Sequence, residues 1–408
     1  MSEVEPLIFN PLDPNFRIDP YSVYARLRTE SPVHQSAFGA WVFSRYADCV
    51  AILRDPRSSS DGRNSEAYEN AIEQGLLNSD ELEMSSQSFL FLDPPDHTRL
   101  RGLVSKTFTP KVVEGLRLHI QSLVDGLLDK VAEKGSLEVI EDLAYPLPVN
   151  VICEMLGVPP EDHVTFREWS REAARSLDPE EALPPDVVEL RKKTFDSFRG
   201  YFSTLIDQRR KEPTEDLISA LIAAEEAGDK LTEGELLSTS ILLLVAGHET
   251  TVNLIGNGML ALLRHPDQLE KLRDDPSLAS SAIEELLRYD PPVQLTGRTA
   301  LEDMEIGGAT IRKGQQMVLL LASANRDPDQ FPDPDRIDIA RKDNRHMAFG
   351  FGVHSCLGAP LARIEGEIAI SSLLRRFRGL ALRTEAPEYK ENIVLRGLQS
   401  LPVSFSTA

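Results

Sequence analysis

The sequence is poor in cysteine. Only three cysteines occur in 408 residues, at Cys49, Cys153 and Cys356. An odd number of cysteines so far apart does not form a disulfide framework, and it is typical of a protein kept in a reducing compartment. No second cysteine lies near any of the three, which excludes zinc and iron–sulfur sites because these need several ligands.

Positive charge and apolar runs near the first residue are also lacking. The chain has 44 Lys and Arg against 65 Asp and Glu, which gives a net charge of −21. Such a chain repels nucleic acid and polyphosphate, so we expect no nucleic-acid partner. Residues 1–6, Met-Ser-Glu-Val-Glu-Pro, have no basic region and no apolar run, so we predict no signal peptide and no membrane anchor. We therefore expect a soluble, acidic, cytoplasmic monomer.

The hydrophobic fraction of 41% is sufficient for a substantial core, and no repeat or low-complexity tract interrupts it. Helical periodicity continues almost without a break from residue 110 to about 230, whereas strand patterns are confined to residues 40–44 and to a hairpin near 305–314. We predict a mainly α fold with a minor β portion. Residues 57–88 are polar and weakly patterned, which indicates a long functional loop. Residues 159–213 are highly charged with scattered aromatics, and we predict surface helices there.

Cys356 lies in the glycine-rich stretch Phe349-Gly-Phe-Gly-Val-His-Ser-Cys-Leu-Gly358, directly before a predicted amphipathic helix. Apolar residues recur there at helical spacing with Arg363, Glu365 and Glu367 between them. Backbone N–H groups and the helix dipole at this position favour thiolate over thiol. A lone thiolate can be the single protein ligand of a haem iron. The cysteine alone also allows a small buried hydrophobe, or a nucleophile with His354 as its base.

A second motif is Phe91-Leu-Asp-Pro-Pro-Asp-His-Thr-Arg-Leu-Arg101. We predict that Asp96 caps a helix after the two prolines. His97 and Arg101 are then four residues apart on one face of that helix. Two such donors can hold a pair of carboxylates, and the alternative is a solvated helix start.

The longest predicted helix begins at a capping box, Thr232-Glu-Gly-Glu235, and continues to about His265. Residues 241–245 are apolar on every side, so this part must be buried. Ala246-Gly-His-Glu-Thr-Thr251 then interrupts the apolar pattern, and the Thr250 hydroxyl can bond back to the Ala246 carbonyl. Burying Glu249 is costly without a partner. This segment is a functional candidate, with a polar notch between neighbouring helices as the alternative.

Phe, Gly, His and Gly at positions −7, −4, −2 and +2 from Cys356 resemble the haem-binding signature of the cytochrome P450 superfamily. Four further motifs occur in the order of that family between residues ~91 and 402. The resemblance implies one haem-thiolate domain over residues 1–408, with a long central helix over the haem. It implies haem b (iron protoporphyrin IX) as cofactor, with Cys356 as the iron ligand. The cofactor contacts implied are His97, Arg101, Ala246, Arg298, Phe349, His354 and Cys356.

The resemblance also assigns roles to side chains outside the haem contacts. Glu249 and Thr250 match the acid–alcohol pair that activates oxygen. Glu285 and Arg288, which alone would indicate a surface ion pair, match a buried structural pair completed by a later arginine. Arg336 is the candidate for that arginine, although Ile337 stands where the family usually has phenylalanine. Substrate contacts are inferred from position alone: Phe89, Leu90, Leu242, Val245, Val293, Leu295 and Val394.

The activity implied is insertion of one oxygen atom from O2 into a mid-sized hydrophobic molecule, by hydroxylation or epoxidation. Terpenoids, steroids, fatty acids and macrolides are the substrate classes considered. With no reductase domain fused to the chain, electrons would come from a separate ferredoxin or flavodoxin with its reductase. Such a carrier would dock on the exposed cations Arg99, Lys106, Lys111, Arg345 and Arg363. Two alternatives remain: a peroxide-driven or nitric-oxide-reducing relative, which tends to lack the acid–alcohol pair, and a non-catalytic haem sensor.

Overall fold

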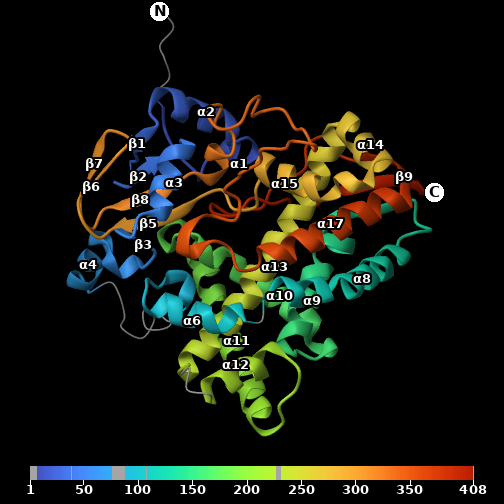
Figure 1. Ribbon diagram of the computed structural model, residues 1–408, viewed down its shortest axis with the longest axis horizontal. Helices are drawn as coiled ribbons and strands as arrows, with labels where there is room; N and C mark the ends of the chain where they lie inside the picture. Colours follow the sequence, from blue (N-terminus) through green and yellow to red (C-terminus); the bar gives the residue numbers. More distant parts are fainter. Residues whose placement is uncertain (1–6, 38, 76–87, 107, 227–230, 408) are drawn as a thin grey trace, which may run out of the picture.

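A helical body and a smaller β-rich part make up this chain, and they lie side by side along helix α13 (Figure 1). The computed structural model describes residues 7–37, 39–75, 88–106, 108–226 and 231–407. Helices dominate, and the strands gather near the N-terminal helices and near the last strand. The prediction of a mainly α protein with a minor β portion is confirmed.

The helices differ greatly in length, and the longest lies at the centre. They are α1 (Pro14–Ile18), α2 (Tyr21–Glu30), α3 (Tyr46–Arg54), α4 (Glu66–Glu73), α6 (Asp96–Ser105), α7 (Pro110–Gly115), α8 (Arg117–Asp129), α9 (Pro146–Leu156), α10 (His163–Ala173), α11 (Pro185–Lys211), α12 (Leu217–Glu226), α13 (Glu233–Arg264), α14 (Pro266–Asp274), α15 (Ala279–Tyr289), α16 (Leu321–Ala324) and α17 (Ala359–Arg376). Short helical turns join them at η1 (Gly62–Asn64), η2 (Phe89–Phe91), η3 (Val139–Ala144), η4 (Pro160–Asp162), η5 (Ala174–Leu177), η6 (Glu180–Ala182), η7 (Pro276–Leu278) and η8 (Gly352–His354).

The strands form three sheets in the described part of the chain. They are β1 (Val33–Gln35), β2 (Trp41–Phe43), β3 (Ser58–Ser59), β4 (Ser136–Glu138), β5 (Thr296–Ala300), β6 (Met304–Ile306), β7 (Ala309–Ile311), β8 (Gln316–Leu319), β9 (Phe377–Leu382) and β10 (Pro402–Thr407). The largest sheet has the order β1-β2-β8-β5-β3, the second has the order β4-β10-β9, and β6 pairs with β7. Only the β2–β8 pair is parallel, with Val42 opposite Val318; the other pairs of these strands are antiparallel.

Helix α13 is the central element, and its sequence explains both its start and its burial. The Thr232 side chain accepts from the Glu235 N–H and the Glu235 carboxylate accepts from the Thr232 N–H, so the predicted capping box is confirmed. The helix then runs to Arg264, as predicted, and packs against α9, α11, α15 and α17. No helix in the described residues is long and apolar enough to cross a bilayer, α13 included.

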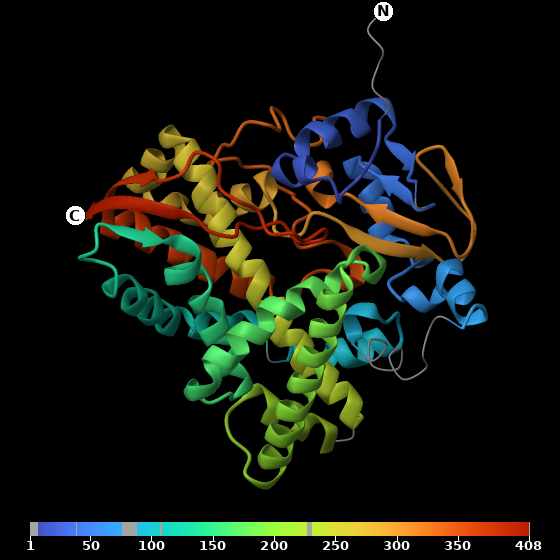
Figure 2. The same ribbon diagram turned by 180° about the vertical axis from the view of Figure 1, so that it is seen from behind.

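The helices α10 and α11 are not the plain surface helices that we predicted. Phe166, Phe198 and Phe202 are fully buried, and their rings meet those of Trp169 and Tyr201 at centroid distances between 4.7 and 6.4 Å. The charged residues between them hide this apolar stripe in the sequence. The two helices pack against each other through this aromatic cluster, and Figure 2 shows their green ribbons in front of α13.

Two smaller predictions about helix ends and faces are also wrong. Asp96 is the first residue of α6, and Pro95 occupies the cap position without a side-chain bond. Glu365 was expected on the polar face of α17, but it is buried, because α8, α13 and α15 cover this helix on several sides. In the predicted loop of residues 57–88, the described part contains β3, η1 and α4, and residues 76–87 lie outside the described residues.

Candidate active site

The loop that carries Cys356 is shaped by glycines and by one backbone hydrogen bond. Gly350 and Gly352 have φ of 64° and 74°, in the left-handed region that favours glycine. A side chain at Gly352 would also place a Cβ 2.3 Å from the Leu53 carbonyl oxygen. The Cys356 N–H donates to the Phe349 carbonyl at 2.8 Å, which closes the loop. Together these features fix the position of the cysteine just before α17.

Cys356 is the exposed cysteine of the three, whereas Cys49 and Cys153 are buried. Although the residue as a whole is exposed, neighbouring protein atoms desolvate its thiol. This desolvation raises the pKa of the thiol above its ordinary value. The N–H groups of Gly358 and Ala359 and the nearby Arg101 act in the opposite direction. The predicted effect of the N–H groups, which favours the thiolate, is thus present, but desolvation of the thiol outweighs it.

Four basic side chains converge next to this loop. The rings of His97 and His354 are 4.1 Å apart, and burial together with the charges of His97, Arg298 and Arg101 lowers the pKa of His354 to about 3. Burial also lowers the pKa of Arg298, to about 10. Both His97 nitrogens and the His354 Nε2 are buried and have no hydrogen-bond partner among the described residues. No carboxylate among the described residues forms an ion pair with these four groups, although Asp93 acts on His97 and Arg298 from a greater distance. The cluster therefore fits a group that brings its own carboxylates.

The arginines of this cluster come from distant parts of the chain. Arg101 on α6 donates to the Ser355 carbonyl, next to the cysteine. Arg298 on β5 donates to the Gly297 carbonyl at 2.6 Å and to the Thr296 hydroxyl at 3.2 Å. Within the described residues no group of three His, Cys, Asp or Glu side chains could hold a metal ion. The residues present fit a haem: the four basic groups would hold its carboxylates, and Cys356 would bind its iron.

Ala246, Glu249 and Thr250 occupy the middle of α13. Ala246 is exposed, and the Thr250 hydroxyl donates to its carbonyl at 2.9 Å, as the sequence predicts. Glu249 is only 2% exposed, and its Oε1 accepts from Lys390 Nζ, whereas Oε2 is buried without a partner among the described residues. Sequence reasoning missed Lys390, because nothing in a loop 141 residues away indicates that it returns to this helix.

The predicted buried pair is present, but its third member differs. Arg288 donates twice to Glu285, at 2.8 Å each, and both side chains are fully buried. Arg341 completes the group through its Nε, 3.0 Å from Glu285 Oε2. Arg336 contributes only its backbone carbonyl, which accepts from Arg288 at 3.1 Å. Arg336 itself is exposed. The prediction that the Arg336 side chain completes the pair is wrong.

The residues predicted to touch substrate lie on α13 itself and on three other segments. Phe89 is buried with its ring 6.5 Å from that of His97, and Leu90, Leu242 and Val245 are half-buried. On the other side, the Val394 carbonyl accepts from the Gln294 N–H at 2.9 Å, and Val293 pairs with Leu395. Leu295 belongs instead to the apolar cluster that contains Phe16 and Tyr24. Contact of any of these side chains with a substrate stays a prediction.

Comparison with known proteins agrees with this geometry. The family model for cytochrome P450 matches residues 62–404. The chain is 42% identical to the polyketide biosynthesis cytochrome P450 PksS of Bacillus subtilis, over 99% of this chain and 100% of that protein. It is 44% identical to the cytochrome P450 monooxygenase PikC of Streptomyces venezuelae, over 96% and 92% of the two chains.

Solved structures give the same result for the fold. The crystal structure of P450BioI in complex with an acyl carrier protein ligated to hexadec-9Z-enoic acid is similar to this chain, with a TM-score of 0.89 and 41% identity. The match covers 96% of this chain and 99% of that one. The chain belongs to the cytochrome P450 family and is a monooxygenase with a haem-thiolate cofactor.

Proposed function

We propose that this monooxygenase binds haem b through Cys356 and inserts one oxygen atom from O2 into a mid-sized hydrophobic molecule. The observation that carries the proposal is the combination of one exposed cysteine with four basic groups, of which His97 and His354 have buried ring nitrogens without hydrogen-bond partners among the described residues. When bound, the haem iron would activate O2, and the thiolate would donate electron density that favours O–O cleavage. That residues 1–408 form a single domain for this purpose stays a prediction.

The basic cluster would orient the cofactor by its carboxylates. Arg101 and Arg298 would supply charge, whereas His97 and His354 would act first as neutral N–H donors, because their pKa values are lowered. A carboxylate placed against these imidazoles would raise their pKa values again. Phe349 would shield the site next to Cys356. Its ring lies 4.5 Å from the Arg363 guanidinium, and its carbonyl accepts a hydrogen bond from the Cys356 N–H.

Glu249 and Thr250 would deliver protons on the α13 side of the site, opposite Cys356. The Thr250 hydroxyl, held by the Ala246 carbonyl, would place a donor at the exposed notch of α13. Glu249, one residue earlier, would resupply that donor with protons. This pair favours O2-dependent chemistry over a peroxide-driven or nitric-oxide-reducing reaction and over a haem sensor.

The relatives support a hydrophobic substrate of this size. PksS is named for polyketide biosynthesis, and P450BioI is crystallised with a carrier protein that bears a 16-carbon acid. These two relatives support fatty-acyl chains and polyketides such as macrolides as substrate classes. The half-buried apolar residues Leu242 and Val245 would face such a molecule.

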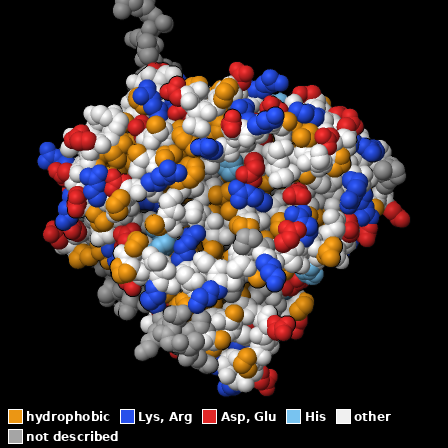
Figure 3. All heavy atoms as spheres, viewed as in Figure 1, with side chains coloured by type: hydrophobic (Ala, Val, Ile, Leu, Met, Phe, Trp, Pro, Cys, Tyr) orange, Lys and Arg blue, Asp and Glu red, His pale blue; other side chains and the backbone are white. Residues whose placement is uncertain are grey.

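Electrons come to members of this family from redox partners, and we propose a separate ferredoxin or flavodoxin with its reductase. Of the cations considered for docking, Arg99 is bound by Glu235 and Arg363 by Glu284. Lys111 and Arg345 are exposed and form no ion pair with any described residue. On the face shown in Figure 3, Lys and Arg side chains are interspersed with Asp and Glu, so docking would depend on local cations rather than on net charge.

The decisive experiment is the absorption spectrum of the reduced carbonyl complex. The wild-type protein should show the strongly red-shifted band of a thiolate-ligated haem, and Cys356→Ser should lose it. Cys49→Ser is the matched control, because it makes the same change at a buried cysteine on α3, and it should keep the band. A Cys356→Ser protein that retained the band would contradict the proposal.

A further inference from the structure

A polar cavity of about 240 Å³ lies beside the middle of α13. Its wall includes the exposed residues Arg171, Glu391 and Gln399 as well as the buried residues Tyr145 and Glu249. The cavity therefore connects the surface with the helix. At ~30 Å³ per molecule, it has room for several waters, and its lining offers each of them polar partners.

At the inner end of this cavity, Lys390 binds Glu249. Lys390 Nζ donates to Glu249 Oε1, and it also donates to Asn253 Oδ1 at 3.2 Å. The lysine side chain is 13% exposed and the glutamate side chain 2% exposed. Glu249 Oε2 is buried and has no partner in the described part of the chain. One oxygen is thus held by the ammonium, and the other remains available as an acceptor.

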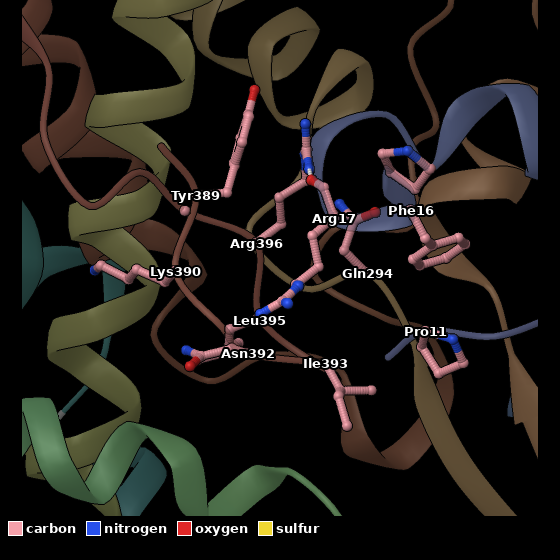
Figure 4. A pocket seen from close by; sticks show the side chains of 12 residues that line it. Pro11, Phe16, Arg17, Gln294, Tyr389, Lys390, Asn392, Ile393, Leu395 and Arg396 are labelled. Carbon is pink, nitrogen blue, oxygen red and sulfur yellow. Dashed lines mark hydrogen bonds between the residues drawn. The ribbon is translucent and has the colours of Figure 1, made fainter. Parts of the chain in front are cut away.

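The position of Lys390 is fixed by its own loop. The Lys390 N–H donates to the Gly397 carbonyl at 2.9 Å, and Asn257 Nδ2 donates to the Arg396 carbonyl at 3.0 Å. Gly397 packs so closely on α13 that a Cβ there would lie 1.8 Å from Asn253 Oδ1. In Figure 4, the Lys390 side chain extends toward the α13 ribbon, away from Tyr389 and Arg396.

Two neighbouring titratable groups, Arg171 and His248, do not compete with Lys390 for Glu249. Arg171 pairs with Glu141 and lies over the Tyr145 ring at 4.6 Å. Burial and nearby cations lower the pKa of His248 well below its ordinary value, so this ring is neutral and does not compete for protons. The other titratable groups in the cavity wall are Glu172, Arg175 and Glu391.

We propose that protons reach Glu249 from solvent through this cavity, and that Lys390 is the positioning residue that keeps Glu249 ionised at its inner end. This inference rests on the proposed function, in which Glu249 resupplies Thr250. In each cycle, the carboxylate takes one proton from water in the cavity and releases one proton toward Thr250. Glu249 thus returns to its starting state, and Lys390 keeps its own charge throughout.

The first test observes the carboxyl group directly in the holoprotein. Infrared difference spectra at neutral pH, with Glu249→Gln to assign the band, should show no protonated Glu249 in the wild type. Lys390→Met should show that band, because a buried carboxylate without a cation takes up a proton. Lys390→Arg should restore the wild-type spectrum, since it keeps the charge.

The matched control is Arg175→Met, which removes one positive charge from the same cavity wall without contacting Glu249. It should leave the Glu249 band absent. A protonated band in the wild type, or its absence in Lys390→Met, would overturn the inference. Lys390→Arg keeps the test valid if Lys390→Met fails to fold, because a protonated band in Lys390→Arg would equally contradict the assigned role.

The second test measures proton delivery. In Lys390→Met, product formed per electron consumed should fall roughly tenfold, as is usual when a positioning partner is removed, and the solvent isotope effect should rise. Lys390→Arg and Arg175→Met should stay near the wild-type values. Unchanged coupling in Lys390→Met, in a protein with an intact carbonyl spectrum, would reject the proton route alone. Loss of the carbonyl band in the wild type would instead reject the proposed function.

Discussion

Glu285 on α15 and Glu249 on α13 are both buried acids that meet a basic side chain, yet their surroundings differ. Glu285 accepts from Arg288, Arg341, Asn344 and the Asp338 N–H, so both of its oxygens are satisfied. Glu249 accepts from Lys390 through one oxygen and has a buried second oxygen without a partner among the described residues.

This difference in hydrogen bonding distinguishes an ion pair that stabilises the fold from one that takes part in proton transfer. A closed set of hydrogen bonds holds its protons and charges in a single arrangement, which suits the join between α15 and the loop of residues 325–341. An acid with a free oxygen next to a polar cavity can exchange a proton with little rearrangement. The same residue types therefore have different roles, and the number of satisfied oxygens indicates which role applies.

Removing Arg288 should have the largest effect on stability. Arg288→Met leaves the carbonyls of Asn325 and Pro334 without their donor and weakens the charge balance of Glu285. We expect a loss of about 3–5 kcal/mol in the free energy of unfolding, together with poor haem retention. Denaturant unfolding measures it. Arg336→Ala, an exposed neighbour, is the control and should stay within ~0.5 kcal/mol; equal losses in both variants would contradict the assignment.

Glu365 extends the comparison to a buried acid with no cation. Burial raises its pKa to about 8, so the folded state keeps a proton that the unfolded state releases near its ordinary value. The folded state binds more protons in this window, and stability should therefore fall by ~1.4 kcal/mol per pH unit as pH rises toward 8.

Glu365→Gln should remove that slope, and unfolding measured from pH 5 to 8 tests it. Glu367→Gln is the matched control on the same helix, since Glu367 is half-buried and paired with Arg117. If the wild type and Glu365→Gln showed parallel pH profiles, Glu365 would be ionised in the folded protein.

Thr250→Ala tests proton transfer next to Glu249, the acid with one unsatisfied oxygen, by a smaller change. It removes one hydroxyl whose bond goes back to its own helix, so haem binding and reduction should be nearly unchanged. Product per electron should fall roughly tenfold, with peroxide released instead, because a positioned proton donor is lost. Thr251→Ala, one residue later, is the control. Equal coupling in the wild type and Thr250→Ala would remove Thr250 from proton delivery.

The smallest effect is expected from surface cations that contact neither Glu249 nor Glu285. Reversing Lys111 and Arg345 together should slow electron transfer from an acidic carrier and flatten its dependence on salt. Stability and substrate affinity should not change measurably. Stopped-flow reduction at several ionic strengths measures this, with reversal of Lys134, a cation outside the proposed docking set, as the control. A rate that ignores salt and both substitutions would place docking elsewhere.

Local sequence patterns predicted the elements that form the site, but they did not predict contacts between segments far apart in the chain. The capping box at Thr232, the back-bonded Thr250 and the glycine loop before Cys356 each depend on neighbours within a few residues. Lys390 and Arg341 reach their acids from loops far along the chain, so no spacing in the sequence indicates them.

Burial was misjudged where the sequence suggested a solvent face that the fold covers. Glu365 has the spacing of an exposed residue, but α17 is packed on several sides. On α10 and α11, the abundance of charge concealed the buried rings of Phe166 and Phe198. Periodicity identifies a helix reliably, whereas the number of its covered faces depends on tertiary packing.

The pairing of β10 with β4 has a consequence for the order of events during synthesis. Val403 lies opposite Leu137, so this sheet closes only after almost 270 residues of intervening chain have been made. The same late segment carries Lys390 to α13 and the Arg396 carbonyl to Asn257. A nascent chain that still lacks this segment has α13 without its polar partners and β4 without its neighbour. We therefore expect the site to form only after this late segment has been synthesised, at ordinary rates of ~5–20 residues per second.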